Sequence, residues 1–227
     1  MQRPPYLDAR SPSRWGRSSF GAVLAVVLSV ACSLGAAPLD SHQPAVTPAV
    51  EDGQAAAVFG GGCFWCLEAD FDKLDGILHT TSGYAGGPQA NPTYTEVAMH
   101  KTQHVEVVRV VYDTSKLTYD EVLHYFWRHV DPTDAGGQFC DRGDVYRTAV
   151  FTLDDTQHTL ALASKKGLDA SGILPGPVVT EVRRVDTFWP AENYHQDFHV
   201  TTPMRYVPYR KGCGRDARVA EVWAKDR

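Results

Sequence analysis

Residues 55–66 read AAAVFGGGCFWC and join a short apolar strand, 55–59, to the start of a helix at Cys63. Apolar residues recur at helical spacing after this cysteine and predict a helix as far as about Leu78. At a helix start, free backbone N–H groups and the helix dipole favour an anion, and the thiolate is the reactive form of a cysteine. The dipole contributes up to about 2 kcal/mol, so we expect it to lower the pKa of Cys63 by roughly one unit.

The first 37 residues are typical of an export signal. Four arginines precede an apolar run over residues 22–30, and small residues follow as far as Ala37. Two processing sites compete: cleavage after Ala37, or a lipoprotein signal that would leave a lipid anchor on Cys32. We therefore expect an exported protein, either in the periplasm or held in the envelope as a lipoprotein.

The chain beyond the signal is acidic. Residues 1–37 contain four arginines and one aspartate, which leaves 18 basic and 26 acidic residues and a net charge near −8. A cationic surface for nucleic acid is not indicated. Residues 38–54, rich in alanine and proline, predict a flexible linker, and residues 55–227 predict a single domain with a C-terminal tail. We expect a monomer.

Four cysteines lie outside the signal: Cys63, Cys66, Cys140 and Cys213. In an exported protein the plainest expectation is two structural disulfides, with three pairings that the sequence cannot tell apart. A chain of this length does not need such bridges, which favours redox chemistry. Zinc held by Cys63, Cys66 and a distant residue such as His195 is less favoured, because a second pair at zinc-finger spacing is missing.

Strands and helices alternate through the rest of the chain and predict a helix-and-sheet sandwich with mixed strand directions. The expected strands are 104–112, 145–153 and 178–186. One helix is expected to begin at the capping box of Thr118 with Glu121, and a second is expected over 155–170. A glycine- and proline-rich loop is expected over 82–94. After Pro190 we expect a short helix at most, then an irregular tail that carries Cys213.

The candidate reaction centre begins with Cys63 as a nucleophile. Cys66, three residues later on the same helical face, is a candidate resolving thiol or a small core residue. Glu106 lies among valines on its strand, where burial would raise its pKa and leave a neutral acid that can donate a proton. A strand-end glutamate that reaches water, or an arginine such as Arg109 or Arg147, is the plainer alternative from spacing alone.

Other side chains are candidates for lining the site. Phe64 and Trp65 flank the thiol and would form an apolar wall, or simply belong to the core. Asp141 and Tyr146 lie at the start of a strand, where side chains can point into a site. His195 invites comparison with a catalytic histidine.

Seven segments, taken together, resemble the A-type peptide methionine sulfoxide reductases, in that family's order. They are Gly62–Trp65, Gly83–Gly87, Asn91–Tyr94, His104–Val107, Asp131–Thr133, Tyr146–Arg147 and Phe188–Gln196. The resemblance covers roughly residues 56–213. It implies an α+β, ferredoxin-like mixed sandwich and an enzyme that reduces the S epimer of methionine sulfoxide, free or in proteins, here for repair of oxidised exported proteins.

The resemblance also implies roles for residues. Cys63 would attack the sulfoxide sulfur while Glu106 protonates its oxygen, which leaves Cys63 as a sulfenic acid. Phe64 and Trp65 would bind the methyl group. The oxygen contacts would come from Tyr94, Glu106 and Tyr146, with Asp141 nearby. The scheme needs no metal or organic cofactor, and an external dithiol such as a thioredoxin would reset the enzyme.

Two departures from the family leave the resolving residue open. Most members have glycine at the position of Cys66, and many have asparagine at that of Cys140. The family's glycine-rich tail favours Cys213 as the resolving thiol on a mobile segment. Cys66 is the next candidate for the resolving thiol. Alternatively, Cys66 and Cys213 could act in turn in a disulfide relay, which Cys140 could join.

Two rival functions fit parts of this pattern. One is a thioredoxin-like dithiol–disulfide oxidoreductase that uses Cys63 and Cys66. It would not need Glu106, because disulfide exchange requires no acid beside the thiol. The other is an exported binding module whose four cysteines are structural.

Overall fold

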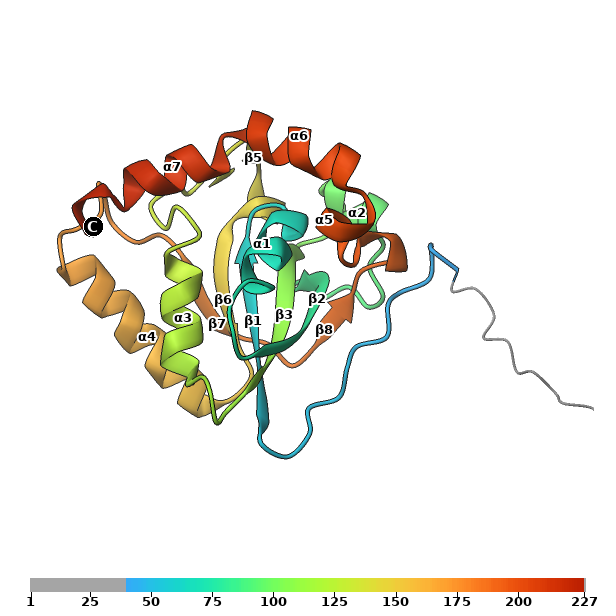
Figure 1. The fold of residues 1–227 in the computed structure, drawn as a ribbon, viewed down its shortest axis with the longest axis horizontal. Helices are drawn as coiled ribbons and strands as arrows, with labels where there is room; N and C mark the ends of the chain where they lie inside the picture. The colour runs from blue at the N-terminus through green and yellow to red at the C-terminus, as the bar shows by residue number, and fades with distance from the viewer. Residues whose placement is uncertain (1–39, 227) are drawn as a thin grey trace, which may run out of the picture. The chain divides into compact units, whose positions relative to one another are not determined.

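The computed structural model describes residues 40–226, so the segment expected to be an export signal, with Cys32, lies outside the described part. In residues 40–226, none of the helices combines the length and the apolar character that a membrane crossing requires. A six-stranded sheet forms the centre (Figure 1). In spatial order its strands are β7 (Glu181–Arg184), β6 (Thr148–Thr152), β1 (Gln54–Gly61), β3 (Val105–Asp113), β2 (Ile77–Ala85) and β8 (Phe188–Pro190).

Neighbouring strands are antiparallel except β6 and β7, which are parallel, so the predicted mixture of directions is confirmed. The side chains of the central strand β3 point alternately to the two faces of the sheet, as its sequence predicted. Val108 and Val110 pack in the main core, whereas Val105 and Val107 pack in a smaller cluster. Because side chains alternate along a strand, Glu106 shares the face of Val108 and Val110.

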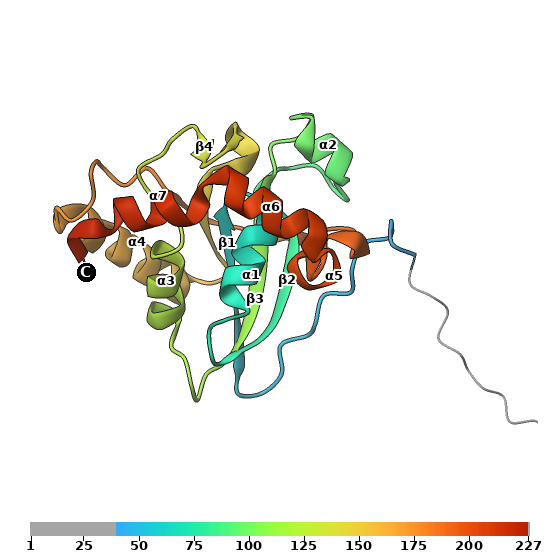
Figure 2. The same cartoon turned by 45° about the horizontal axis from the view of Figure 1, so that its top comes forward.

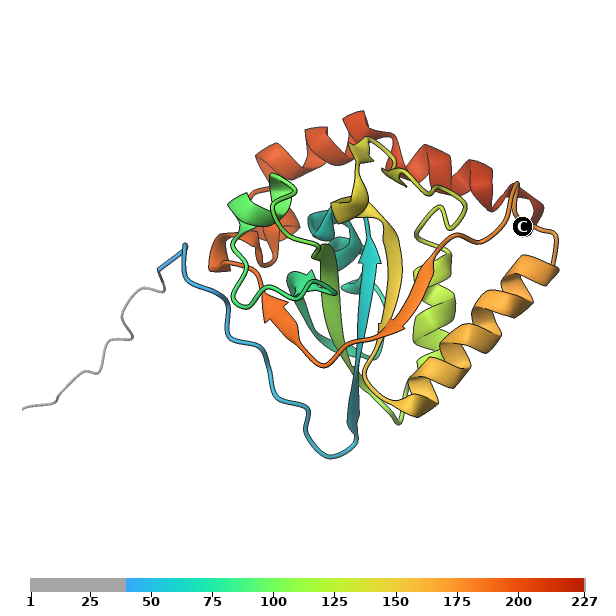
Figure 3. The ribbon, with the colours of Figure 1, turned by 180° about the vertical axis from the view of Figure 1, so that it is seen from behind.

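The helices that pack on the sheet from one side are α1 (Phe64–Phe71), α3 (Tyr119–Trp127) and α4 (Asp155–Ala170), and all place residues in the main core. They cover one face of the sheet, and the strands come forward in the view from behind (Figure 3). The capping box that predicted α3 is present, and α4 has the predicted bounds. The smaller elements are α2 (Tyr94–Ala98), β4 (Gly137–Gln138), β5 (Asp141–Arg142), and the 3-10 turns η1 (Asp144–Tyr146), η2 (Asn193–His195) and η3 (Ala224–Asp226).

The C-terminal segment is helical, so the expectation of an irregular, mobile tail is wrong. It forms α5 (Phe198–Thr201), α6 (Pro203–Cys213) and α7 (Arg215–Val222), which pass over the α1 side of the domain (Figure 2). Proline and glycine misled the prediction: Pro203 occupies the first turn of α6, and Gly214 ends that helix with φ +70°. Both positions tolerate these residues without breaking a helix.

Two other expectations need correction. Helix α1 ends at Phe71 rather than near Leu78, because the chain turns at Gly76, with φ +100°, and enters β2. The expected loop over 82–94 is therefore shorter, since its first four residues pair in β2 with β3.

The segment before β1 was expected to be a flexible linker, but part of it is held against the domain. The backbone N–H of Ala45 donates to the Ala191 carbonyl at 2.9 Å, and the N–H of Asn193 donates to the Gln43 carbonyl at 2.9 Å.

Candidate active site

The nucleophile candidate lies at a tight junction between β1 and α1. Gly62 has φ +82°, and a Cβ there would come within 2.7 Å of Gln138 Cβ, so the position accepts only glycine without displacement. Cys63 then occupies the N-cap of α1, as the sequence predicted, although its side chain caps no backbone N–H. The side chain is 6% exposed.

Glu106 reaches this helix start from β3. The backbone N–H of Phe64, the first helical residue, donates to Glu106 Oε2 at 3.0 Å. Glu106 is 2% exposed, and burial raises its pKa to about 8, against the opposing effect of the Phe64 hydrogen bond. The carboxyl is therefore protonated at neutral pH, as its valine neighbours predicted, and Oε2 is the oxygen that accepts the N–H.

The expected low pKa of Cys63 is wrong. Burial raises the pKa of this thiol well above its ordinary value, and a hydrogen bond with Cys66 and the nearby Glu106 act in the same direction. A helix dipole contributes at most about 2 kcal/mol, which is too little to offset complete removal from water. Cys63 is a neutral thiol in this state.

The pKa of Cys66 is shifted in the opposite direction. It is 2% exposed, and its backbone N–H donates to the Cys63 carbonyl at 3.1 Å. The hydrogen bond with Cys63 lowers the pKa of Cys66, and Arg215 and Arg210 assist, against the effect of burial. Of the two thiols at this helix start, Cys66 is the one that ionises more readily.

Aromatic residues from distant segments surround the pair. Phe64 is buried in the main core, and the Trp65 ring stacks on Phe198 with centroids 3.8 Å apart. Burial raises the pKa of Tyr94 to about 12 and that of Tyr146 as well, and both phenols interact with Glu106 and Cys63. They are neutral hydroxyl donors beside the acid and the thiol.

His195 packs among the aromatic residues of the site. Its Nδ1 accepts a hydrogen bond from Trp65 Nε1 at 3.0 Å, and burial lowers its pKa to about 3. The ring also lies 4.4 Å from that of Tyr94, centroid to centroid. A neutral histidine in this position supports the rings of Trp65 and Tyr94. The comparison with a catalytic histidine stays a prediction.

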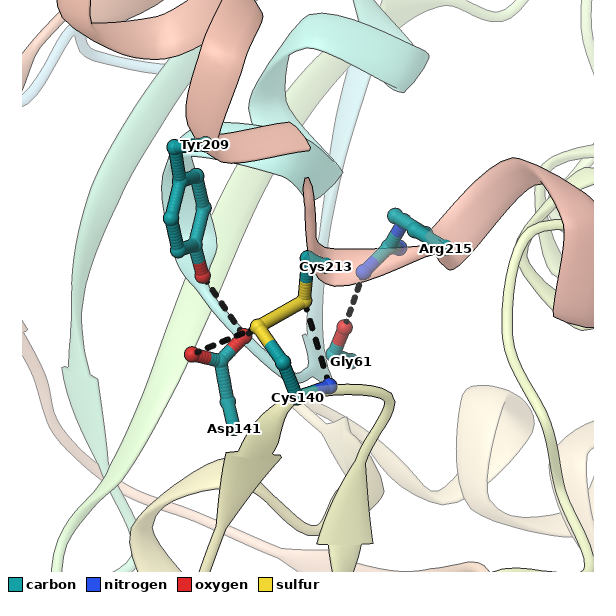
Figure 4. The surroundings of a disulfide bond; sticks show 6 residues. All are labelled: Gly61, Cys140, Asp141, Tyr209, Cys213 and Arg215. Carbon is teal, nitrogen blue, oxygen red and sulfur yellow. Dashed lines mark hydrogen bonds between the residues drawn. A yellow bond between two sulfur atoms is a disulfide. The ribbon is translucent and has the colours of Figure 1, made fainter. Parts of the chain in front are cut away.

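The other two cysteines form a disulfide. Cys140, just before β5, is bonded to Cys213 at the end of α6 (Figure 4). Each sulfur lies 3.8 Å from a carboxylate oxygen of Asp141. The segment that carries Cys213 is helical rather than a mobile tail, and Cys63 and Cys66 are free. The role of Cys213 as the resolving thiol stays a prediction.

The structure brings Cys63, Cys66, Glu106, Tyr94, Tyr146, Asp141, Phe64 and Trp65 together, and the disulfide adjoins them through Asp141. Sequence reasoning missed Tyr209, whose hydroxyl donates to Asp141 Oδ2 at 2.6 Å. It also missed Arg215, which is 2% exposed and donates to the carbonyls of Gly61 and His129, both at 2.8 Å. A tyrosine and an arginine in a segment of proline and glycine carry no pattern that marks the first as part of the site or the second as buried.

Residues 55–227 match the sequence model of the family described as Peptide methionine sulfoxide reductase. The chain belongs to this family. Its activity is the thiol-dependent reduction of methionine S-sulfoxide to methionine, and the resemblance drawn from the motifs is confirmed. The thioredoxin-like alternative and the binding module are wrong.

Relatives and solved structures agree with this assignment. The chain is 47% identical over 169 residues to MsrA of Bacillus licheniformis, which covers 74% of this chain and 93% of that protein. It is 50% identical over 167 residues to MsrA 2 of Rhizobium meliloti, with 74% and 82% covered. Methionine sulfoxide reductase A of Corynebacterium diphtheriae superposes with a TM-score of 0.60 at 31% identity, with 67% and 77% covered. Mxr1 of Saccharomyces cerevisiae in reduced form superposes with a TM-score of 0.64 at 26% identity, and the match covers 68% of this chain and 90% of Mxr1. The predicted α+β class is confirmed.

Proposed function

We propose that Cys63 attacks the sulfoxide sulfur while Glu106 protonates the sulfoxide oxygen. A sulfoxide is a poor electrophile until its oxygen is protonated, so the nucleophile and a neutral acid must lie together. The observation that supports these roles is the hydrogen bond from Phe64 N–H to Glu106 Oε2, because it places a protonated carboxyl at the helix start that carries Cys63. The oxygen moves to Cys63 as a sulfenic acid, and methionine leaves.

The aromatic groups hold the substrate in this scheme. Phe64 and Trp65 bind the methyl group, and the hydroxyls of Tyr94 and Tyr146 donate to the sulfoxide oxygen alongside Glu106. The high pKa of each phenol keeps its proton in place. Asp141 lies at the edge of this group.

Cys66 is the residue that resolves the sulfenic acid. It is free, it is hydrogen-bonded to Cys63, and its lowered pKa supplies the thiolate that displaces hydroxide from the Cys63 sulfur. Cys213, the residue that the sequence favoured, is bonded to Cys140 in this state.

The electrons reach the buried pair through Cys140 and Cys213. Cys63 and Cys66 are 6% and 2% exposed, so a protein reductant cannot attack their disulfide, whereas Cys140 is exposed. The reduced Cys140–Cys213 pair transfers two electrons to the Cys63–Cys66 disulfide and becomes oxidised itself. A thioredoxin-like dithiol then reduces it, and no prosthetic group takes part.

The substrates are oxidised exported proteins, and the protein acts as a monomer in the periplasm or, through Cys32, as an envelope lipoprotein. The basis is the signal pattern of residues 1–37. Cell fractionation with N-terminal analysis of the mature chain decides between cleavage after Ala37 and lipidation of Cys32. A full-length protein that stays in the cytoplasm would rule out both.

Mass mapping tests the chemistry directly. The fully reduced protein is mixed with one equivalent of a peptide that carries methionine S-sulfoxide, quenched at intervals and digested. The scheme predicts one methionine per protein, a Cys63–Cys66 disulfide first and a Cys140–Cys213 disulfide later. A Cys63–Cys213 disulfide as the first product would assign resolution to Cys213 instead.

A further inference from the structure

The sulfur atoms of Cys140 and Cys213 share their surroundings with the carboxylate of Asp141. Asp141 Oδ1 lies 3.8 Å from the Cys140 sulfur, and Asp141 Oδ2 lies 3.8 Å from the Cys213 sulfur (Figure 4). In the part of the chain that the structure describes, ligand atoms from three His, Cys, Asp or Glu residues come within 4.8 Å of one another only here. Thiolates and carboxylates are both zinc ligands in proteins.

The spacing of these atoms suits a tetrahedral metal ion. Zn–S bonds of about 2.3 Å and Zn–O bonds of about 2.0 to 2.2 Å place neighbouring tetrahedral ligands about 3.5 to 3.8 Å apart. Both sulfur–carboxylate distances already lie at the upper end of this range. A disulfide sulfur is a poor ligand, because metals bind the thiolate. Reduction of the disulfide supplies two thiols and lets the sulfurs separate to the spacing that the metal requires.

Contacts other than the disulfide hold the two segments together. The paired ends of β4 and β5 leave Phe139 and Cys140 as the two-residue turn of a hairpin. The Arg215 guanidinium lies 4.7 Å from the centroid of the Phe139 ring and ties this turn to α7. On α6, the Tyr209 hydroxyl donates to Asp141 Oδ2 at 2.6 Å. Reduction therefore leaves the ligand residues beside one another.

The groups around the sulfurs favour a bound cation. The backbone N–H of Cys140 donates to the Cys213 sulfur at 3.1 Å, and such a hydrogen bond stabilises a thiolate. The Tyr209 hydroxyl orients the Asp141 carboxylate, as outer hydrogen bonds do for metal ligands. Arg215 also acts on Asp141. Two thiolates, one carboxylate, one guanidinium and a divalent cation together carry no net charge.

We propose that Cys140, Cys213 and Asp141 form a redox-controlled site for one Zn²⁺, which binds only when the disulfide is reduced. The protein supplies three ligands, and Cys140 is exposed, so water can occupy the fourth position. The thiols release two protons as the two Zn–S bonds form, and no oxidation state changes in this step. An external dithiol, such as the thioredoxin-like reductant, supplies the two electrons that break the disulfide.

Bound zinc arrests the electron relay of the proposed function, on which this consequence rests. A thiolate held by zinc does not attack the Cys63–Cys66 disulfide, and it is not oxidised to a disulfide until the metal leaves. In the proposed scheme, methionine formation at Cys63 uses neither Cys140 nor Cys213. Zinc therefore stops turnover after the first methionine.

Metal titration tests the site itself. The fully reduced protein, freed from reductant without exposure to oxygen, competes for Zn²⁺ with a chromophoric chelator. We expect one zinc per protein, and binding to the oxidised protein at least about 100-fold weaker, because the thiolates are then absent. X-ray absorption of the zinc complex should show two sulfur ligands, with oxygen ligands in the remaining positions.

Variants assign the ligands. Cys140→Ser/Cys213→Ser should bind zinc at least about 100-fold more weakly, because the soft ligands are lost. Cys63→Ser/Cys66→Ser is the matched control: it also removes two of the thiols, and its affinity should stay within about threefold of the parent, because the sites are separate. Asp141→Asn should weaken binding by at least about 10-fold, the lower end of the effect for groups that support a metal site.

Zinc that follows Cys63 and Cys66 instead, or that binds the oxidised and reduced proteins alike, would overturn the proposal. An X-ray absorption spectrum with fewer than two sulfur ligands would overturn it as well.

A count of methionine tests the consequence and separates it from the proposed function. Without an external reductant, excess sulfoxide peptide should yield two methionines per metal-free protein, because four thiols form two disulfides. The zinc-loaded protein should yield one, and a chelator should restore the second. Two methionines from the zinc-loaded protein would contradict the arrest of the relay. A single methionine from the metal-free protein would contradict the relay of the proposed function, while the zinc titration decides the site independently.

Discussion

The two pairs of cysteines in this molecule occupy opposite environments. Cys63 and Cys66 lie at the start of one helix, buried and free, whereas Cys140 and Cys213 are separated by 73 residues and form a disulfide with an exposed member. A neutral acid such as Glu106 requires burial, but a protein reductant requires an exposed sulfur. One pair cannot satisfy both needs, which is why the proposed scheme assigns the chemistry to the buried pair and electron entry to the exposed one.

Removal of the nucleophile gives the largest effect. Cys63→Ser should reduce single-turnover methionine formation by at least about 1,000-fold, because the hydroxyl is too weak a nucleophile to replace the thiol. Rapid quench and chromatography of the peptide product measure it. Cys140→Ser, on the surface pair, should keep the first turnover near the parent rate. Equal losses in both variants would erase the distinction between the pairs.

The acid comes next. Glu106→Gln should slow sulfoxide reduction by about 100- to 1,000-fold, in the range for a general acid. In the parent, the pKa of Glu106 is raised to about 8, so the reactive protonated form is complete at lower pH and is lost as the pH rises through about 8. A pH–rate profile of kcat/KM should show this alkaline fall, and the Gln variant should lack it. Disulfide exchange between the cysteine pairs should survive the substitution.

The positions of Cys63 and Glu106 could largely be predicted from the sequence, because short-range patterns encode them. The glycine run placed Cys63 at a helix start, and alternation along one strand placed Glu106 on the core face. Those patterns did not include burial, which depends on the whole fold. The pKa of Cys63 was therefore predicted in the wrong direction, since complete desolvation outweighs a dipole of about 2 kcal/mol.

The contacts between the C-terminal helices and the segment around Cys140 could not be predicted from the sequence. The Cys140–Cys213 disulfide and the Tyr209–Asp141 hydrogen bond join residues 73 and 68 positions apart. Spacing carries no information on such pairings. The helices that make them possible are held by Arg215, a buried cation with backbone acceptors that only the folded chain supplies.

Loss of the buried partner should have a smaller effect than loss of the nucleophile or the acid. Cys66→Ser should still form one methionine per protein in the first turnover. Steady-state turnover should fall by about tenfold, because the Cys63 sulfenic acid lacks its neighbouring thiolate. A probe that alkylates sulfenic acids, followed by mass spectrometry, should find the label on Cys63. Rapid appearance of a Cys63–Cys213 disulfide with undiminished turnover would contradict the role of Cys66.

The surface pair should give the smallest change in the chemical step and a distinct change elsewhere. The double variant Cys140→Ser/Cys213→Ser should keep the first turnover within about threefold of the parent, the residual loss coming from a looser α6. Turnover with a thioredoxin-like protein should fall by about tenfold, while turnover with a small dithiol that enters the buried site should fall less. The free energy of unfolding should drop by about 2 to 4 kcal/mol, as for other disulfides, which denaturant titration measures. If the protein reductant sustains parent turnover in this variant, electrons enter at Cys63 and Cys66 directly, and the division between the pairs is structural only.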